Sequence, residues 1–135
     1  MTPVFDDTLY WYGLANRRDQ WHPRVLQAKA VVAGRLVITT EEVLTEFLAA
    51  MSGDSFLRRA ARILVEALFR DSGVTVLPQS HDSFLKGFAL YSARPDKAYS
   101  LTDCISMEVC KPQGILEVLT NDHHFTQEGF NLLIR

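Results

Sequence analysis

Short apolar runs alternate along the chain with longer segments in which apolar residues recur every three or four positions. The short runs are typical of buried strands, and the three-to-four spacing is typical of helices. The pattern predicts strands over residues 2–7, 36–38, 74–77, 115–119 and 130–134. Helices are expected over residues 8–16, 22–33, 41–51, 54–71 and 80–93, and from residue 102 to residue 111. Strands and helices therefore alternate from one end of the chain to the other.

Capping residues mark the starts of two of these helices. Thr39 and Glu42 have the spacing of a capping box, in which each side chain bonds to the backbone amide of the other residue. Thr102 is expected to cap the helix that carries Asp103. Pro112 then ends that helix, since proline lacks the amide that a helix interior requires.

The alternation of strands and helices predicts the fold class. Parallel strands joined by helices of ten or more residues require right-handed crossovers. We therefore expect an α/β fold, a three-layer α/β/α sandwich with a mainly parallel sheet of four to five strands. With 135 residues and 47% apolar residues, the chain should form one domain over residues 1–135. Ligands in such folds bind beyond the carboxyl ends of the strands.

Composition excludes several classes of protein. The 14 Lys and Arg residues nearly balance the 16 Asp and Glu residues, for a net charge of −2, unlike a strongly basic nucleic-acid binder. The sequence shows neither an apolar run of about 18 residues nor a signal peptide, so we expect a cytoplasmic protein without a membrane anchor. Cys104 and Cys110 are too few for a disulfide framework and are expected to be reduced packing residues.

Four carboxylates are expected at one rim of the sheet. Asp7 ends the first strand, Glu46 lies in the helix after the second strand, Asp103 begins a helix, and Asp122 follows the fourth strand. Each alone is explained by the preference of acidic residues for helix starts. Together they repel, by about 3 kcal/mol for each pair about 5 Å apart at an effective dielectric constant near 20. Such a group requires raised pKa values or a cation, and its oxygen ligands favour Mg²⁺ or Mn²⁺ over Zn²⁺.

Four segments together resemble a PIN domain, and more narrowly the VapC-type toxin ribonucleases. They are Val4–Thr8, Thr39–Phe47, Ser100–Ser106, and Leu119–Phe125 with Gly129 and Phe130. The resemblance covers almost the whole chain in the order and spacing of the family. It implies a Mg²⁺- or Mn²⁺-dependent endoribonuclease that hydrolyses RNA phosphodiester bonds. It also implies a homodimer that is inhibited by a small antitoxin, whose tail enters the acidic groove.

The resemblance also assigns roles to individual residues. The family's metal ligands match Asp7, Glu46, Asp103 and Asp122, and its supporting groups match Thr8 and Asn121. Asp6 departs from the family, which usually has an apolar residue there. Buried in the core, Asp6 would cost one to several kcal/mol unless paired. At the rim it would add an outer carboxylate.

Several polar residues near these segments have two interpretations. His123 and His124 beside Asp122 are candidates for a metal ligand or a general base, but they are expected instead to pack or to orient their neighbours. Arg17 and Arg18 follow an aromatic helix and are candidates for RNA contacts. Four arginines on the helix over residues 54–71 form either a solvated face or a surface for RNA or another partner; they are Arg58, Arg59, Arg62 and Arg70.

Rival functions differ in the residues that they require. A phosphoacceptor receiver domain would need an Asp after the third strand and a Lys after the fifth, and a haloacid dehalogenase would need Asp-x-Asp at the first strand; this sequence has neither pattern. An RNA-processing or decay nuclease without an antitoxin, and a non-catalytic binding module of the PIN type, remain open. If the four rim carboxylates are set aside, 12 acidic groups face 14 basic ones, a balance of +2. RNA binding should therefore strengthen when divalent cations fill the cleft.

Overall fold

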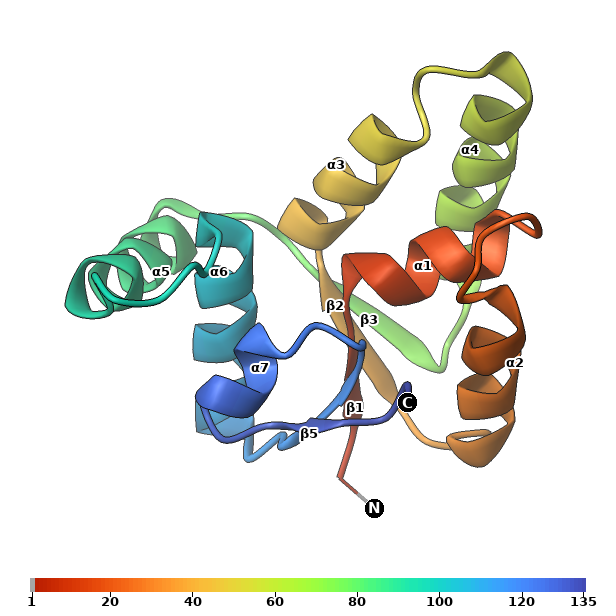
Figure 1. Ribbon diagram of the computed structural model, residues 1–135. Helices are drawn as coiled ribbons and strands as arrows, with labels where there is room; N and C mark the ends of the chain where they lie inside the picture. Colours follow the sequence, from red (N-terminus) through yellow and green to blue (C-terminus); the bar gives the residue numbers. More distant parts are fainter. Residues whose placement is uncertain (1) are drawn as a thin grey trace.

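The computed structural model describes residues 2–135 and contains one five-stranded sheet with helices on both faces (Figure 1). The strands are β1 (Val4–Asp6), β2 (Val37–Thr40), β3 (Val74–Leu77), β4 (Glu117–Leu119) and β5 (Asn131–Leu132). Every pairing is parallel, and the strand order is β3-β2-β1-β4-β5. The predicted α/β fold with a parallel sheet is confirmed.

The helices divide into groups around this sheet. They are α1 (Thr8–Ala15), α2 (His22–Val31), α3 (Glu41–Ala50), α4 (Ser55–Arg70), α5 (His81–Ala93), α6 (Leu101–Cys110) and α7 (His124–Gln127), with a 3-10 turn at Lys111–Gln113. In Figure 1, α1 and α2 lie on one side of the sheet, α5, α6 and α7 lie on the other, and α3 and α4 form an arm beyond the strands. The sequence missed α7 because one turn is too short to show a helical repeat.

The helix α3 begins at Glu41, as the sequence predicted, but its capping residue lies one position later than predicted. Thr40 caps this helix, because its hydroxyl accepts a hydrogen bond of 3.1 Å from the amide of Val43. Thr39 is instead part of β2, and its hydroxyl donates to the carbonyl of Asp6 over 2.9 Å. The prediction of Thr39 as the cap was wrong because the strand extends two residues beyond its apolar run.

The start of α6 also differs, and the difference concerns the site. Ser100 is the cap, and Thr102 lies inside the first turn. The amide of Asp103 donates to the Ser100 hydroxyl, and the amide of Ser100 donates to Asp103 Oδ2, each over 3.0 Å. The prediction of Thr102 as the cap was therefore wrong. The capping box fixes the side chain of Asp103 at the helix start.

The order of the strands places a topological switch point, called the crevice in such folds, beside β1. From β1 the chain builds outward through β2 and β3, and it then crosses to β4 and β5 on the other side of β1. Ligands of open parallel sheets bind at such a switch point, outside the carboxyl ends of the two strands that flank it. Asp6 is in register with Leu119, so the residues that follow β1 and β4 meet at this crevice.

Close packing holds α6 in place behind the crevice. A Cβ atom at Gly87 of α5 would lie 2.3 Å from Ile105 Cγ1 of α6, so the close approach of the two helices requires glycine at this position. Cys104 and Cys110 of α6 are buried and free, as predicted. Figure 1 shows α5 lying along the outer side of α6.

Candidate metal centre

The four carboxylates predicted from the sequence lie around the crevice between β1 and β4. Asp7 joins β1 to α1, Glu46 lies in the middle of α3, Asp103 in the first turn of α6, and Asp122 between β4 and α7. Asp7 and Asp103 are buried, Asp122 is partly buried, and Glu46 is exposed. Their charges interact, because Asp103 and Glu46 both raise the pKa of Asp7, and Asp122 raises that of Asp103.

Asp7 is the most deeply placed of the four carboxylates. Burial raises the pKa of Asp7 to about 7, the charges of Asp103 and Glu46 add to the rise, and hydrogen bonds from Thr8 and Thr120 oppose it. The hydroxyl of Thr120 donates to Asp7 Oδ2 over 3.0 Å. No basic side chain is among the causes of this shift, so the charge of Asp7 is stabilised by dipoles alone.

On α6, the effects that raise the pKa of Asp103 also outweigh those that lower it. Burial raises its pKa, the charge of Asp122 raises it further, and Ser100 and His124 act in the opposite direction. One oxygen of Asp103 is engaged in the capping box with Ser100. Two buried carboxylates on different elements thus share a region with little positive charge from the protein itself.

The two supporting residues predicted from the sequence occupy different places. The hydroxyl of Thr8 donates to Glu46 Oε1 and so ties the exposed side chain of α3 to the start of α1. The side-chain amide of Asn121 donates a hydrogen bond of 2.6 Å to the backbone carbonyl of Ile134, and so holds the C-terminal segment beside β4. Thr8 therefore contacts a predicted ligand directly, whereas Asn121 acts on the backbone.

His124 lies inside the acidic group, although the sequence analysis favoured a packing or orienting role for it over a metal-binding one. Its Nδ1 is 3.4 Å from Asp103 Oδ2 and 3.2 Å from Asp122 Oδ1. The backbone amide of His124 also donates to Asp122 Oδ1 over 3.0 Å. His123 is exposed. One-turn α7 brings His124 and not His123 to the carboxylates, and the sequence pattern gave no sign of that turn.

Thr120 is a second site residue that sequence analysis missed. It is fully buried at the end of β4, where it donates to Asp7 and accepts a 3.1 Å hydrogen bond from the amide of Asp122. One hydroxyl therefore fixes two of the carboxylates relative to each other. The sequence feature that points to Thr120 is a β-branched hydroxyl residue two positions before an acidic residue, at the end of the strand that pairs with β1.

Asp6 lies in the core, the first of the two placements that the sequence allowed. Its side chain is 1% exposed, and its Oδ1 has no hydrogen-bond partner among residues 2–135. Burial and then the charge of Asp7 raise the pKa of Asp6 well above its usual value. Successive residues of a strand point to opposite faces, so Asp6 faces away from the side to which Asp7 points.

The donor set suits a hard divalent cation. Ligand atoms of Asp103, Asp122 and His124 all lie within 4.8 Å of one another. Buried carboxylates that repel one another become stable when a cation offsets their charge. The raised pKa values of Asp7 and Asp103 and the buried Nδ1 of His124, which has no hydrogen bond in the described part of the chain, fit a bound cation.

Comparison with known proteins identifies the architecture. No family model matches the sequence, and a search of curated proteins finds no significant match. Among solved structures, the Mycobacterium tuberculosis toxin VapC20 superposes with a TM-score of 0.84 at 23% identity, over 95% of this chain and 96% of the other. The chain has the PIN-type fold of the VapC toxins.

Two more distant structures share this PIN-type fold. VapBC2 of Rickettsia felis, bound to a DNA fragment from its promoter, matches with a TM-score of 0.70 at 12% identity, over 97% of each chain. DNA-bound VapBC of Salmonella typhimurium matches with a TM-score of 0.68 at 13% identity, over 98% of this chain and 97% of the other. At these identities the likeness concerns the fold.

The arginines singled out from the sequence lie at two places on the PIN-type fold. Arg17 and Arg18 are exposed in the loop after α1. The eight residues of α1 separate this loop from Asp7 by about 12 Å along the helix axis. A nucleic-acid strand bound at the crevice could therefore reach these arginines within a few nucleotides.

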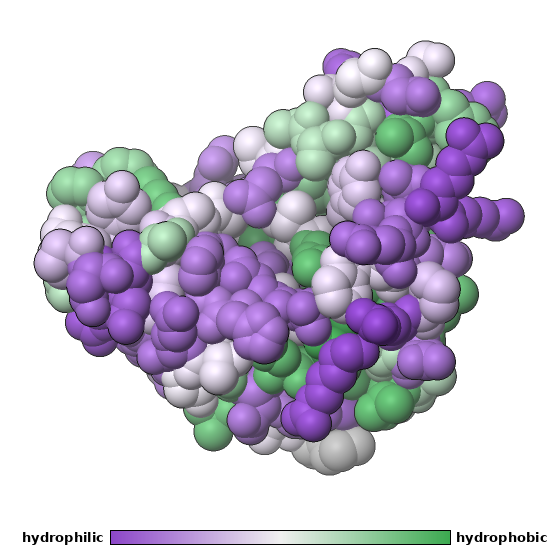
Figure 2. Space-filling view, in the orientation of Figure 1, coloured by the Kyte–Doolittle hydropathy of each residue, from purple (hydrophilic) through white to green (hydrophobic). Residues whose placement is uncertain are grey.

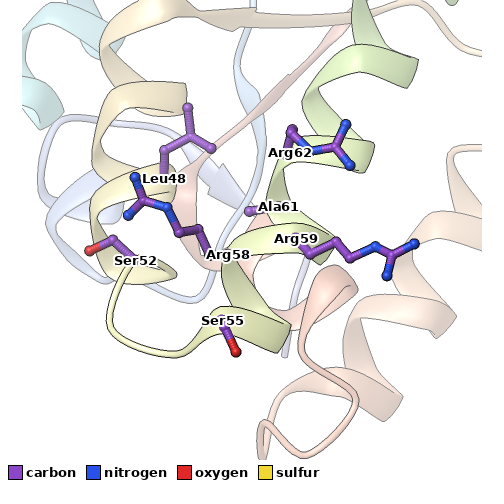
Figure 3. Close-up of a pocket in the computed structure, with 7 residues that line it drawn as sticks. All are labelled: Leu48, Ser52, Ser55, Arg58, Arg59, Ala61 and Arg62. Carbon is purple, nitrogen blue, oxygen red and sulfur yellow. The ribbon is translucent and has the colours of Figure 1, made fainter.

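Arginines of α4 border a hollow of about 580 Å³ against α3 (Figure 3). Arg58 extends toward α3 beside Leu48 and Ser52, whereas Arg59 and Arg62 point away from α3. Leu48 lies two positions after Glu46, about 200° around the helix, so the hollow and the carboxylates are on different faces of α3. This hollow is separate from the candidate metal centre.

Hydrophilic and hydrophobic patches are both visible on the surface (Figure 2). It is hydrophilic over α7 and the neighbouring segments, and hydrophobic at the edge formed by α5. On α5, Phe84, Phe88 and Tyr91 are each about half exposed, with successive ring centroids 6.2 and 6.4 Å apart. None of the helices in the described part of the chain has the length and apolar character needed to cross a membrane.

Proposed function

We propose that this protein is a Mg²⁺- or Mn²⁺-dependent endoribonuclease, and that Asp7, Glu46, Asp103 and Asp122 hold the metal. One observation carries the proposal: the carboxylates after β1, on α3, on α6 and in the β4–α7 loop interact at the switch point of a PIN-type fold, and the pKa of Asp7 is raised to about 7. A divalent cation bound there would activate water and offset charge on the phosphodiester.

The residues around the ligands have defined tasks in this proposal. Thr120 fixes the carboxylate of Asp7, and the amide of Ser100 fixes that of Asp103. Thr8 holds Glu46 at the open side of the crevice, where it is exposed to solvent and to a substrate. The protein thus supplies a rigid inner half and a more accessible outer half of the metal site.

RNA is the substrate class that the comparisons favour. The matching VapC20 structure is described as a sarcin–ricin loop cleaving toxin, and this chain matches it over nearly its full length. At 23% identity the target sequence does not carry over, because RNA specificity depends on loops and stacking surfaces. We therefore assign the class of substrate, RNA, and not the cleavage sequence.

A small antitoxin is the proposed protein partner, and the cytoplasm is the proposed location. Two of the matching structures are VapBC assemblies, and a third is FitAcB from Neisseria gonorrhoeae, with a TM-score of 0.68 at 14% identity, over 96% of this chain and 95% of the other. The proposal makes this chain the toxin of a pair whose partner blocks the acidic crevice.

Cleavage of RNA by the purified protein tests the proposed activity. We expect single-stranded RNA to be cut with Mg²⁺ or Mn²⁺ and left intact with a chelator. Asp7→Asn and Asp103→Asn should each abolish cutting, whereas Glu108→Gln, a carboxylate of α6 that pairs with Lys111, should leave it intact. Unchanged cleavage in both aspartate variants would refute the proposed site.

Expression in cells separates the toxin from the two alternatives. A toxin should arrest growth when expressed alone and should be tolerated when expressed with the product of a short neighbouring reading frame. An RNA-processing or decay nuclease would cut RNA in vitro without arresting growth. A non-catalytic binding module would do neither, and growth arrest that persists in Asp103→Asn would contradict the toxin proposal.

A second copy of the chain is the other proposed partner. Exposed apolar patches mark interaction surfaces, and the ring stripe of Phe84, Phe88 and Tyr91 on α5 is such a patch. We expect a homodimer by light scattering and a monomer for Phe88→Asp. A monomeric wild-type chain at high protein concentration would exclude this arrangement.

A further inference from the structure

We propose that His124 Nδ1 binds the same divalent cation as Asp103 and Asp122, which makes the centre a mixed nitrogen–oxygen site that favours Mn²⁺ over Mg²⁺. This inference rests on the proposed metal-dependent function and names a ligand that the resemblance to the PIN family did not supply. It begins from the position of one atom that has no ordinary bonding partner.

The spacing of the three ligand atoms matches a coordination shell. Around an octahedral cation with bonds of about 2.1 Å, neighbouring ligand atoms lie about 3.0 Å apart. His124 Nδ1 is 3.2 Å from Asp122 Oδ1 and 3.4 Å from Asp103 Oδ2. Small movements of the side chains would therefore bring the nitrogen and both oxygens to one cation.

Nδ1 lies at ion-pair distance from both carboxylates, but its geometry toward them is poor for a hydrogen bond. The atom is buried, yet it forms no hydrogen bond of acceptable geometry to any group in residues 2–135. A buried polar atom without a partner is rare in proteins and costs free energy. A cation between the nitrogen and the two carboxylates satisfies all three groups at once.

Surrounding contacts hold the ring in this orientation. The rings of Tyr99 and His124 meet edge to face, with centroids 5.7 Å apart at an angle of 60°. The hydroxyl of Tyr99 donates to Glu128 Oε1 over 3.3 Å, and Arg94 Nε donates to the same oxygen over 2.6 Å. Metal-binding histidines are commonly oriented by such outer contacts, which fix the ring and the nitrogen that faces the metal.

The nature of the ligand determines which cation benefits. Mg²⁺ takes oxygen ligands almost exclusively and retains several of its waters. Imidazole nitrogen is a ligand of first-row transition ions; Mn²⁺ binds it least strongly in that series, but more strongly than Mg²⁺ does. An imidazole in the shell should therefore raise the affinity for Mn²⁺ much more than the affinity for Mg²⁺.

Metal binding to the RNA-free protein tests the inference independently of cleavage. Pulsed electron paramagnetic resonance of bound Mn²⁺ should show coupling to a histidine nitrogen in the wild type. Replacement of histidine ¹⁴N by ¹⁵N in the wild-type protein should shift that coupling, a result that needs no variant. Competition between Mn²⁺ and Mg²⁺ then measures the preference.

Two matched variants assign the nitrogen. His124→Phe keeps an aromatic ring beside Tyr99 but removes the nitrogen, and His123→Phe makes the same change at the exposed neighbour. We expect His124→Phe to lose the coupling and about tenfold in Mn²⁺ affinity, with less than about a threefold change for Mg²⁺. His123→Phe should behave as the wild type, and thermal melting checks that both variants fold.

The possible outcomes separate this inference from the proposed function. Absence of nitrogen coupling in the wild type, or its persistence in His124→Phe, overturns the role of His124, and RNA cleavage in the same samples would leave the nuclease proposal standing. Nitrogen coupling in a protein that cuts no RNA supports the site and contradicts the activity. An unchanged Mn²⁺ to Mg²⁺ preference in His124→Phe overturns the inference.

Discussion

Two regions of this molecule contain buried carboxylates, and the carboxylate pKa is lowered in one region and raised in the other. The side chain of Glu128, on the α7 side of the molecule, is only 8% exposed, and it meets Arg94 at 2.6 Å, Lys111 at 3.8 Å and the hydroxyl of Tyr99. Burial alone would raise the pKa of Glu128, but Arg94 and Lys111 more than offset it, and the pKa is lowered.

The candidate metal centre has no such internal compensation. Around Asp7 and Asp103 the neighbouring dipoles are hydroxyls and amides, and burial and then the neighbouring carboxylates raise both pKa values. His124 lowers the pKa of Asp103 but does not offset the rise. The chain therefore contains the means to neutralise a buried carboxylate with its own cations and uses them at Glu128. At the rim the charge is reduced either by protonation, which the raised pKa values favour, or by the cation that we propose.

The largest effect that tests this comparison is on catalysis. Asp103→Asn should lower the rate of RNA cleavage by at least about 10³-fold, because it removes a metal ligand. Glu128→Gln should lower it by less than about tenfold, because Glu128 acts only through Tyr99 and the orientation of His124. Initial rates at saturating Mn²⁺ measure both.

Thermal melting in the presence of chelator adds a second readout to the same two variants. Asp103→Asn should stabilise the metal-free protein, because it relieves repulsion with Asp122. Glu128→Gln should destabilise it by about 1 kcal/mol, less than the loss of a fully buried pair because Arg94 is 38% exposed. Shifts of the same sign would show that the two regions do not differ as described.

The pH dependence of stability should also have opposite signs in the two regions. The pKa of Asp7 is about 7 in the folded protein against 3.8 for an ordinary Asp, so the folded state binds more protons between these values. The stabilising contribution of Asp7 is complete below about pH 4 and is lost as the pH rises through 7. A shift of one pKa unit corresponds to about 1.4 kcal/mol.

Melting temperatures between pH 4 and pH 8 measure this dependence. With chelator present, we expect Asp7→Asn to flatten the fall in stability with rising pH. Saturating Mn²⁺ should reverse the fall, since the cation binds the ionised form. Glu128→Gln should instead remove a contribution that is present above the unfolded pKa and lost as the pH falls, because the pKa of Glu128 is lowered. A steep fall that survives in Asp7→Asn would assign the titration to another group.

Sequence analysis predicted much of the rim but not its inner contacts. Strand ends and helix starts place Asp7, Asp103 and Asp122 near one another in any parallel sheet with this order of elements. His124 escaped because its approach depends on one turn of α7, and Thr120 escaped because its two hydrogen bonds depend on the pairing of β1 with β4. Local patterns define elements, whereas such contacts arise only when the elements pack.

Asp6 provides the next test, since it is a buried carboxylate that neither a protein cation nor the proposed metal satisfies. Asp6→Val should stabilise the protein by about 1–2 kcal/mol, because it removes an unpaired polar group and suits a strand. Asp6→Asn, which keeps a polar group there, should gain less. Equal melting temperatures for Asp6→Val and the wild type would mean that Asp6 is satisfied in solution.

The smallest expected effects concern RNA binding. They measure how strongly the negative charge of the rim carboxylates lowers the affinity for RNA. Without a cation, the carboxylates repel RNA, so Mn²⁺ should strengthen binding of a cleavage-resistant phosphorothioate RNA by about tenfold at matched ionic strength. Arg17→Ala with Arg18→Ala should weaken binding by about two- to threefold with or without Mn²⁺, because each arginine contributes one phosphate contact at most.

The salt dependence of the same binding curves separates the two contributions. Loss of two phosphate contacts should reduce the slope of log affinity against log salt by about 1.4, since each contact to single-stranded RNA contributes about 0.7. The matched control is Arg58→Ala with Arg59→Ala, on the arm beside the separate hollow, which should leave the slope unchanged. Equal affinity with Mn²⁺ and with chelator would show that the negative charge of the rim does not control access of RNA to the crevice.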